Sequence, residues 1–434
     1  MKTTVIGGGL AGCEAALQLA KNGIEVDLYE MRPEKMTDAH TGENLAEFVC
    51  SNSLGSFDET NASGLLKKEM SLLGSFLIET AFESKVPAGA ALAIDREVFS
   101  SKITRMIEEN NKINLIRKEI MEIPQEGAVV VASGPLTSVA LAENIKKFTG
   151  EEHLHFFDAI APIVEKDSID FDTAFYAGRY DKGEPSYINC PMNKEQYENF
   201  YNILINAPQI KMKEFEKGAK FFESCLPVEV IASRGVDTLR YGPMKPVGLT
   251  DKRTSIENYA VVQLRQDNLS ASMYNLVGFQ TNLKWGAQKE LIHSIPGLQN
   301  ANILRYGVMH RNTFINSPKL LNQFLQSKKR NNLFFAGQIT GTEGYSESIA
   351  SGMYAGINLS RHLKGEPMLE LPDITMLGAL MKYISFDGHK HFQPVNSNWG
   401  IVAELDADKK TKKNKKLKNE LLAKRSIDYI SELK

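Results

Sequence analysis

Three glycines near the start of the chain, Gly7, Gly9 and Gly12, have the G-x-G-x-x-G spacing. They follow a β-branched run and open a segment with helical apolar spacing, and VDLYE at 26–30 then predicts a second strand. In such a unit the glycines allow a tight turn, a close approach to a pyrophosphate and close packing of the helix on the strand. Glu30 stands 18 positions after Gly12, where a ribose hydroxyl is expected. The alternative is a glycine-rich turn that merely joins strand to helix.

We therefore predict a dinucleotide site in this βαβ unit. The residues expected to bind the cofactor here are Gly7, Gly8, Gly9, Leu10, Ala11, Gly12 and Glu30.

The length and composition predict more than one lobe. A chain of 434 residues with 42% hydrophobic content exceeds the size at which single cores stop growing, roughly 250 to 300 residues. No apolar run approaches the roughly 18 residues of a membrane span, and the N-terminus enters a strand at once, so a cytoplasmic protein without membrane contact is expected. The four cysteines, Cys13, Cys50, Cys190 and Cys225, form no C-x-x-C pair, which favours neither disulfides nor a metal site. A cysteine with a functional role would therefore act chemically, as a free thiol.

The net charge of the chain limits how it could bind nucleic acid. The formal net charge is −2, so contact with RNA would have to come from local patches. Residues 409–418, KKTKKNKKLK, hold seven lysines in ten positions. This segment is either such a patch or a solvated, partly frayed tail.

The middle of the chain differs from its two ends. A polar stretch at 36–64 is typical of an active-site loop, and a helical pattern follows at 64–82. The buried run AVVVASGPLTS at 128–138 predicts a strand that enters a turn at Gly134 beneath the cofactor. From 166 to 299 short strands mix with helices, which indicates an inserted α+β substrate domain.

The nucleotide-binding pattern returns at 332–361, where LFFAG leads into a glycine-rich loop and a helix with small residues. The cofactor residues expected in this loop are Gly337, Gln338, Gly341, Gly344 and Tyr345. The predicted fold is α/β, a Rossmann-like FAD-binding domain split by the insert. We place its first part at 1–165, the insert at 166–299, and its second part at 300–434, with the lysine-rich tail from 409.

Several blocks of the chain resemble a known family. They are EFVCSNSL, LLKKEM, VPAGAALAIDRE, FFESCLPVEV, DTLRYGPMKPVGL, AVVQLRQDN, YNLVGFQTNLKWGAQK, RYGVMHRNTFINSP and FFAGQITGTEGYSESIASG. Together, from residue 3 to about residue 400, they resemble the folate- and FAD-dependent tRNA uracil-5-methyltransferases, the TrmFO family. The loop at 337–352 is also shared with GidA-type tRNA-modifying flavoproteins, whereas the two cysteine segments are specific to the smaller family.

The resemblance implies a methyltransferase that makes 5-methyluridine. It would take a one-carbon unit from 5,10-methylenetetrahydrofolate, reduce it with FADH2 and place it on C5 of a uridine, and NAD(P)H would reduce the flavin again. The expected partner is tRNA, at its T loop; similar paralogues act on a ribosomal RNA uridine, and GidA-like proteins on a wobble uridine. Other classes left open are a plain NAD(P)H-flavin oxidoreductase and a noncatalytic RNA-binding protein. The oligomeric state is not predicted.

Two thiols are the expected catalytic residues. C5 of uracil is a poor nucleophile until a group adds to C6, and a thiolate is suited to that addition. A second group must remove the C5 proton. By resemblance, Cys50 and Cys225 are this pair. Cys225 is the preferred C6 nucleophile, with Cys50 as general base or as a holder of the flavin-bound methylene, and the roles could be exchanged.

Cationic residues in the matching blocks are candidates for anion binding. The candidates that would suit RNA phosphates or the glutamate tail of folate are Arg240, Lys245, Arg265, Lys284, His310 and Arg311. The alternative for each is an ordinary surface or ion-paired residue. The chain also departs from the family where Gly55 follows CSNSL, a place where an arginine is common.

Overall fold

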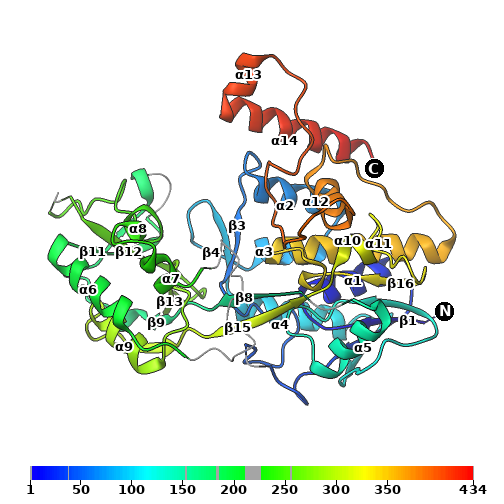
Figure 1. The fold of residues 1–434 in the computed structure, drawn as a ribbon, viewed down its shortest axis with the longest axis horizontal. Coiled ribbons are helices and arrows are strands. Elements are labelled where there is room, and N and C mark those ends of the chain that lie inside the picture. Colours follow the sequence, from blue (N-terminus) through cyan, green and yellow to red (C-terminus); the bar gives the residue numbers. More distant parts are fainter. Residues whose placement is uncertain are drawn as a thin grey trace.

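The computed structural model describes residues 2–37, 39–151, 154–181, 185–210, 226–254 and 257–433. Figure 1 shows two lobes side by side, with the N- and C-termini both on the larger one. The long antiparallel pair β8 (Leu154–Ala159) and β15 (Met309–Phe314) runs between the lobes.

A parallel sheet forms the centre of the larger lobe. Its order is β16 (Leu333–Phe335), β7 (Ala128–Val131), β1 (Thr3–Ile6), β2 (Val26–Glu30) and β6 (Ile113–Arg117). All four strand pairs are parallel, and β7 and β16 are completely buried. Continuous apolar runs such as AVVV are expected in strands that are covered on both faces. The predicted Rossmann-like α/β class is confirmed.

Two helices cross closely over this sheet. The helix α1 (Leu10–Lys21) follows the glycine turn, and α11 (Tyr345–Lys364) follows the returning loop. A Cβ on Gly352 would lie 2.2 Å from the Ala11 carbonyl oxygen, and one on Gly356 would lie 2.8 Å from that of Ala15. The small residues of α11 therefore let its backbone contact that of α1, which brings the two nucleotide-binding segments together although they are more than 300 residues apart.

The segment 64–82, for which one helical pattern was expected, forms two helices. The first, α2 (Ala62–Leu73), ends at Gly74 in the left-handed conformation with φ +80°, and α3 (Phe76–Glu83) begins after its Ser75 cap. The buried Glu14 of α1 accepts hydrogen bonds from the Ser75 hydroxyl and the Leu77 amide, both at 2.9 Å. The Glu14 side chain therefore provides an acceptor for a backbone amide in the first turn of α3 and links this helix to α1 in the core.

Further elements complete this lobe. They are β3 (Ser53–Ser56), β4 (Lys85–Val86) and β5 (Ala91–Ile94) in a small sheet, with α4 (Arg96–Glu108), α5 (Val139–Thr149), α10 (Ser317–Leu320), a 3-10 turn η5 (Gln338–Thr340) and α12 (Met376–Ser385).

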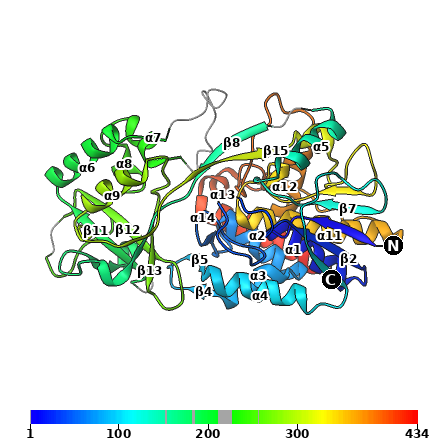
Figure 2. The same ribbon diagram turned by 90° about the horizontal axis from the view of Figure 1, so that it is seen from below.

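The smaller lobe has its own sheet and core. The sheet has the order β10 (Phe175–Ala177), β11 (Tyr187–Met192), β12 (Ala260–Gln266), β13 (Met273–Leu276), β9 (Ile163–Glu165) and β14 (Ile303–Arg305), and its pairs are antiparallel. The other elements of the lobe are η1 (Lys166–Ser168), η2 (Arg179–Asp181), α6 (Lys194–Asn206), α7 (Val228–Ser233), α8 (Thr238–Tyr241) and α9 (Trp285–His293). Tyr197 and Phe200 of α6 are fully buried in its core. Figure 2 shows the helices α6, α8 and α9 gathered at this end of the molecule.

The lysine-rich C-terminal segment is helical and not frayed, while most of its described lysines are solvent-exposed. It forms α13 (Lys409–Lys413) and α14 (Lys415–Glu432). Leu422, Ala423 and Ile430 are buried against the larger lobe, and the Ser426 hydroxyl donates to the buried carboxylate of Glu69 on α2. The apolar side chains on this face of α14 hold the helix against the lobe. No helix in the described part of the chain combines the length and apolar content needed to cross a bilayer.

Candidate functional site

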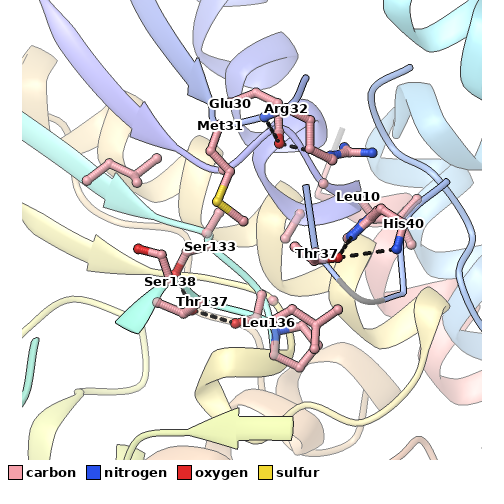
Figure 3. Close-up of a pocket in the computed structure, with 18 of the residues that line it drawn as sticks. Leu10, Glu30, Met31, Arg32, Thr37, His40, Ser133, Leu136, Thr137 and Ser138 are labelled. Carbon is pink, nitrogen blue, oxygen red and sulfur yellow. Dashed lines mark hydrogen bonds and ion pairs between the residues drawn. The ribbon is translucent and has the colours of Figure 1, made fainter. Parts of the chain in front are cut away.

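A pocket opens where β1, β2 and β7 end, at the carboxyl edge of the parallel sheet. This is the edge at which open α/β sheets bind ligands. Nine of the residues predicted to bind the cofactor line it: Gly7, Gly9, Leu10, Ala11, Glu30, Gly134, Gly337, Gln338 and Tyr345. Figure 3 shows Glu30 and Arg32 on one side of this pocket and the segment from Ser133 to Ser138 on another. We call it the nucleotide pocket.

The backbone around the start of α1 leaves room for a ligand. A Cβ built on Gly9 or on Gly134 would meet no atom within 4 Å. Helix α1 begins at Gly9 without a side-chain cap, so the first amides of the helix have no side-chain acceptor. An uncapped helix N-terminus that faces a pocket suits a negatively charged group such as a pyrophosphate.

Glu30 lies at the end of β2, in contact with the glycine turn. One carboxylate oxygen accepts from the Gly8 amide at 2.8 Å, and the other accepts from the Arg32 amide at 3.0 Å and its Nε at 2.9 Å. Burial alone would raise the pKa of Glu30, but the charge of Arg32 and these hydrogen bonds outweigh it, so the pKa is lowered. Glu30 is therefore a carboxylate at neutral pH and accepts hydrogen bonds.

Arg32 is a lining residue that the sequence did not single out. Its side chain is 1% exposed and also pairs with Glu47 at 2.9 Å, yet its Nη2 has no hydrogen-bond partner among the described residues. A buried donor without an acceptor is costly, and a ligand in the pocket would satisfy it. Sequence spacing offers no signal for this residue, because arginines after a second strand are common on surfaces.

Four of the predicted cofactor residues do not line this pocket: Gly8, Gly12, Gly341 and Gly344. A Cβ on Gly12 would lie 1.8 Å from the Gly7 carbonyl oxygen, which is the close helix-strand packing expected from the motif. Gly8 lies against Leu45 and Glu30, and Gly341, with φ +86°, lies against Phe392. These three positions are constrained by packing.

A second pocket adjoins the first and contains Cys50. We call it the thiol pocket. Four residues, Val49, Pro135, Gln338 and Tyr345, line both pockets and form their shared wall. The thiol pocket is further lined by Ser51, Ser53, Leu54, Gly55, Ser63, Arg265, Gln280, Glu343, Gly344, Ser346, Glu347, Asn396 and Ser397. Arg265 and Gln280 come from the smaller lobe, so this pocket lies where the two lobes meet.

Cys50 is held by its backbone as well as its side chain. Its amide donates to the Tyr345 hydroxyl at 2.6 Å, and its sulfur donates to the Ala159 carbonyl at 3.3 Å. The Arg96 guanidinium donates to the carbonyl of Cys50 at 3.4 Å. The thiol is half-buried, which suits a reacting group that substrate must reach.

The segment after Cys50 is attached to the smaller lobe by two buried links. The side-chain Nδ2 of Asn52 donates to the backbone carbonyl of Gln266 at 2.9 Å, and its Oδ1 accepts from the Nε of Arg265 at 3.0 Å. Nearby, Arg96 pairs with Asp267 at 2.9 Å. The position of Cys50 therefore depends on the placement of the two lobes.

The other cysteines differ sharply from Cys50. Cys13 and Cys190 are completely buried, and burial raises the pKa of both thiols, for Cys190 to about 12. Neither can supply a thiolate at neutral pH, so both are structural residues. Cys225, the expected partner of Cys50, lies outside the described residues.

The candidate anion-binding residues divide into two kinds. Arg240 pairs with Asp237 at 2.7 Å and its guanidinium stacks on Tyr259, with 3.5 Å to the ring centroid, so it matches the ion-paired alternative. Lys245 and Lys284 line neither pocket. Arg265 is 8% exposed and lines the thiol pocket. Gly55, which stands where the family often has arginine, lines the same pocket.

Comparisons with known proteins agree with this geometry. The family model of glucose inhibited division protein A, GidA, matches residues 2–367. A methylenetetrahydrofolate–tRNA-(uracil-5-)-methyltransferase, TrmFO, of Brevibacillus brevis is 55% identical over 98% of this chain and 97% of its own. The TrmFO of Anoxybacillus flavithermus is 54% identical over 99% and 98%. The solved structure of Aquifex aeolicus GidA superposes with a TM-score of 0.71 at 17% identity, over 100% of this chain and 73% of that one, which shows the shared fold.

Proposed function

Since the chain belongs to the GidA family and, within it, to the TrmFO proteins, we propose that it is the methyltransferase that forms 5-methyluridine in tRNA. The carbon donor is 5,10-methylenetetrahydrofolate, and the reaction depends on FAD. We place this activity in the cytoplasm, where tRNA and reduced folate are available.

The observation that carries this proposal is the wall shared by the nucleotide and thiol pockets. Tyr345 lines both pockets and accepts a hydrogen bond from the amide of Cys50. Uracil methylation from a folate donor needs a nucleophilic thiol and a redox cofactor within reach of one pyrimidine ring. Two adjoining pockets, one suited to a dinucleotide and one with a thiol, supply this arrangement.

The residues of the nucleotide pocket fit FAD. The open space at Gly9 and the uncapped start of α1 would receive the pyrophosphate, Glu30 would accept from a ribose hydroxyl, and the unpartnered Nη2 of Arg32 would find an acceptor. When bound and reduced, the flavin supplies the hydride that turns the transferred carbon into a methyl group. NAD(P)H is the proposed source of those electrons.

We propose that Cys50 and Cys225 perform the covalent chemistry. A thiolate sulfur, preferably that of Cys225, adds to C6 of the uridine, and the electrons of the C5–C6 double bond move to O4. C5 can then attack the one-carbon unit, and removal of the C5 proton by a base expels the nitrogen or sulfur that carried this carbon, leaving an exocyclic methylene. A hydride, which the reduced flavin would supply, would convert that methylene to a methyl group as the C6–sulfur bond breaks and returns the thiolate. Cys50 is the proposed base or carrier of the carbon. Residues 166–299 would form the substrate domain over this centre.

The direct test is product formation. Purified protein with methylenetetrahydrofolate, NADPH and an unmodified tRNA transcript should yield 5-methyluridine, detected in nuclease digests, and a transcript with cytidine at the target should not. Absence of product on tRNA would reject the proposal. A 23S rRNA fragment in parallel tests the ribosomal paralogue, and NADPH oxidation without RNA measures the plain oxidoreductase activity.

A further inference from the structure

Three polar side chains form a row across the sheet of the smaller lobe, and one of them lines the thiol pocket. Tyr187, Arg265 and Asn275 are directly paired across β11, β12 and β13, so their side chains lie on one face of the sheet. Arg265 itself lines the pocket that contains Cys50.

Arg265 has a buried charge without a counter-ion. Its side chain is 8% exposed, and no carboxylate of the described residues forms an ion pair with it. The acidic residue nearest along the strand, Asp267, pairs with Arg96 instead. The guanidinium uses Nε for Asn52, and the Tyr187 hydroxyl is a second, neutral partner. A buried guanidinium is normally paired, because its desolvation is otherwise uncompensated.

Asn275 provides an independent observation. It is 1% exposed, and its Nδ2 has no hydrogen-bond partner among the described residues. It stands opposite Arg265 in the ladder, so an unsatisfied donor lies beside the buried guanidinium. An oxyanion in the thiol pocket would supply the counter-charge that Arg265 lacks, and a planar guanidinium suits phosphate particularly well.

We propose that Arg265 binds a phosphodiester next to the target uridine and so positions that nucleotide over Cys50. This rests on the proposed function and adds the site by which the smaller lobe holds RNA. A nucleotide that leaves its stack brings its own phosphates into the pocket. The carboxylates of folate lie at the end of that molecule far from the reacting carbon, so they fit a buried residue beside Cys50 less well.

The test compares phosphate removal with arginine removal. tRNA T-arm oligonucleotides carry a neutral methylphosphonate on either side of the target uridine, and binding is measured with wild type and with Arg265→Gln across a salt series. We expect the methylphosphonate on one side of the target uridine to weaken RNA binding to wild type at least tenfold. The same oligonucleotide should bind Arg265→Gln as well as the unmodified oligonucleotide does. The salt slope of binding should fall by about one in the variant.

The controls distinguish the loss of this phosphate site from a general loss of positive charge. Arg253→Gln removes a positive charge of the same lobe that already pairs with Asp251 at 2.8 Å, and it should bind both oligonucleotides like wild type. If neither methylphosphonate weakens wild type, the proposal is overturned whatever the variant does. It is equally overturned if Arg265→Gln weakens tetrahydrofolate binding and leaves RNA binding intact. Failure of wild type to methylate tRNA would instead reject the proposed function.

Discussion

The amide of Cys50 donates a 2.6 Å hydrogen bond to the hydroxyl of Tyr345, which joins residues 295 positions apart. Cys50 lies within the polar stretch after the first βαβ unit, and Tyr345 is the first residue of α11 behind the returning loop. This bond fixes the thiol segment to the wall of the nucleotide pocket. Several properties of the protein should depend on it.

Replacing Tyr345 by Phe should slow methylation about tenfold, because the Cys50 segment loses its attachment, while the stability cost is about 1 kcal/mol. Rates of 5-methyluridine formation and thermal melting measure the two effects. Tyr354→Phe is the matched control on the same helix, since its hydroxyl donates to the Leu369 carbonyl at 2.7 Å away from the site. An equal loss of rate in both variants would contradict a role for the Cys50 bond.

The thiols should differ in reactivity. At pH 8, iodoacetamide should alkylate the half-buried Cys50 while Cys13 and Cys190 stay unmodified, because burial raises the pKa of both buried thiols. Peptide mass spectrometry after timed labelling gives the result. Cys50→Ala should abolish 5-methyluridine formation, whereas Cys190→Ala should retain it. Labelling of Cys190 in the native protein at the rate of Cys50 would contradict this description.

The crossing of α1 and α11 should not tolerate a methyl group. Gly352→Ala would place a Cβ 2.2 Å from the Ala11 carbonyl oxygen, and such overpacking typically costs about 1 to 3 kcal/mol. The start of α1 would shift, so FAD affinity should fall as well. Gly286→Ala, in a helix with no atom within 4 Å of the new Cβ, should be neutral or slightly stabilising. Melting temperature and flavin content of the purified variants measure both effects.

Stability should fall as pH rises between about 4.5 and 7 because of Glu69. Burial raises the pKa of this carboxyl to about 7, so the folded protein keeps a proton that the unfolded chain releases at lower pH. The resulting loss of folding free energy is absent below the pKa of Glu69 in the unfolded chain and is complete above about pH 7. Melting temperatures at pH 5, 6 and 7 should therefore decline more steeply in wild type than in Glu69→Gln. Parallel pH profiles would show that Glu69 does not titrate in this range.

The C-terminal helix should contribute stability through its apolar face. Truncation after residue 408 removes buried Leu422 and Ile430, a loss of roughly 3 to 6 kcal/mol from these two side chains. Replacing the exposed Lys410, Lys413 and Lys415 by Gln should leave the melting temperature unchanged. The same variant should bind tRNA more weakly at low salt if these lysines meet phosphates. A truncated protein as stable as the full chain would show that α14 is dispensable.

Local spacing was enough to predict the nucleotide-binding half of the fold. The glycines at 7, 9 and 12 and the carboxylate at 30 lie within one βαβ unit, where backbone geometry repeats from protein to protein. The family resemblance singled out Cys50 in the same way, from contiguous residues, and the comparisons confirm the family. The break at Gly74 was missed because apolar periodicity continues through a residue that adopts the left-handed conformation.

The relationships that make the site depend on residues far apart in the chain. Arg32 beside Glu30, Tyr345 beside Cys50, and the row from Tyr187 to Asn275 each arise from strand register, helix crossing or lobe contact. A residue pattern along one segment carries no information about the segment that will pack against it. The parts of the site were therefore readable in the chain, whereas the shared wall between its pockets and the unpaired charge of Arg265 came from packing.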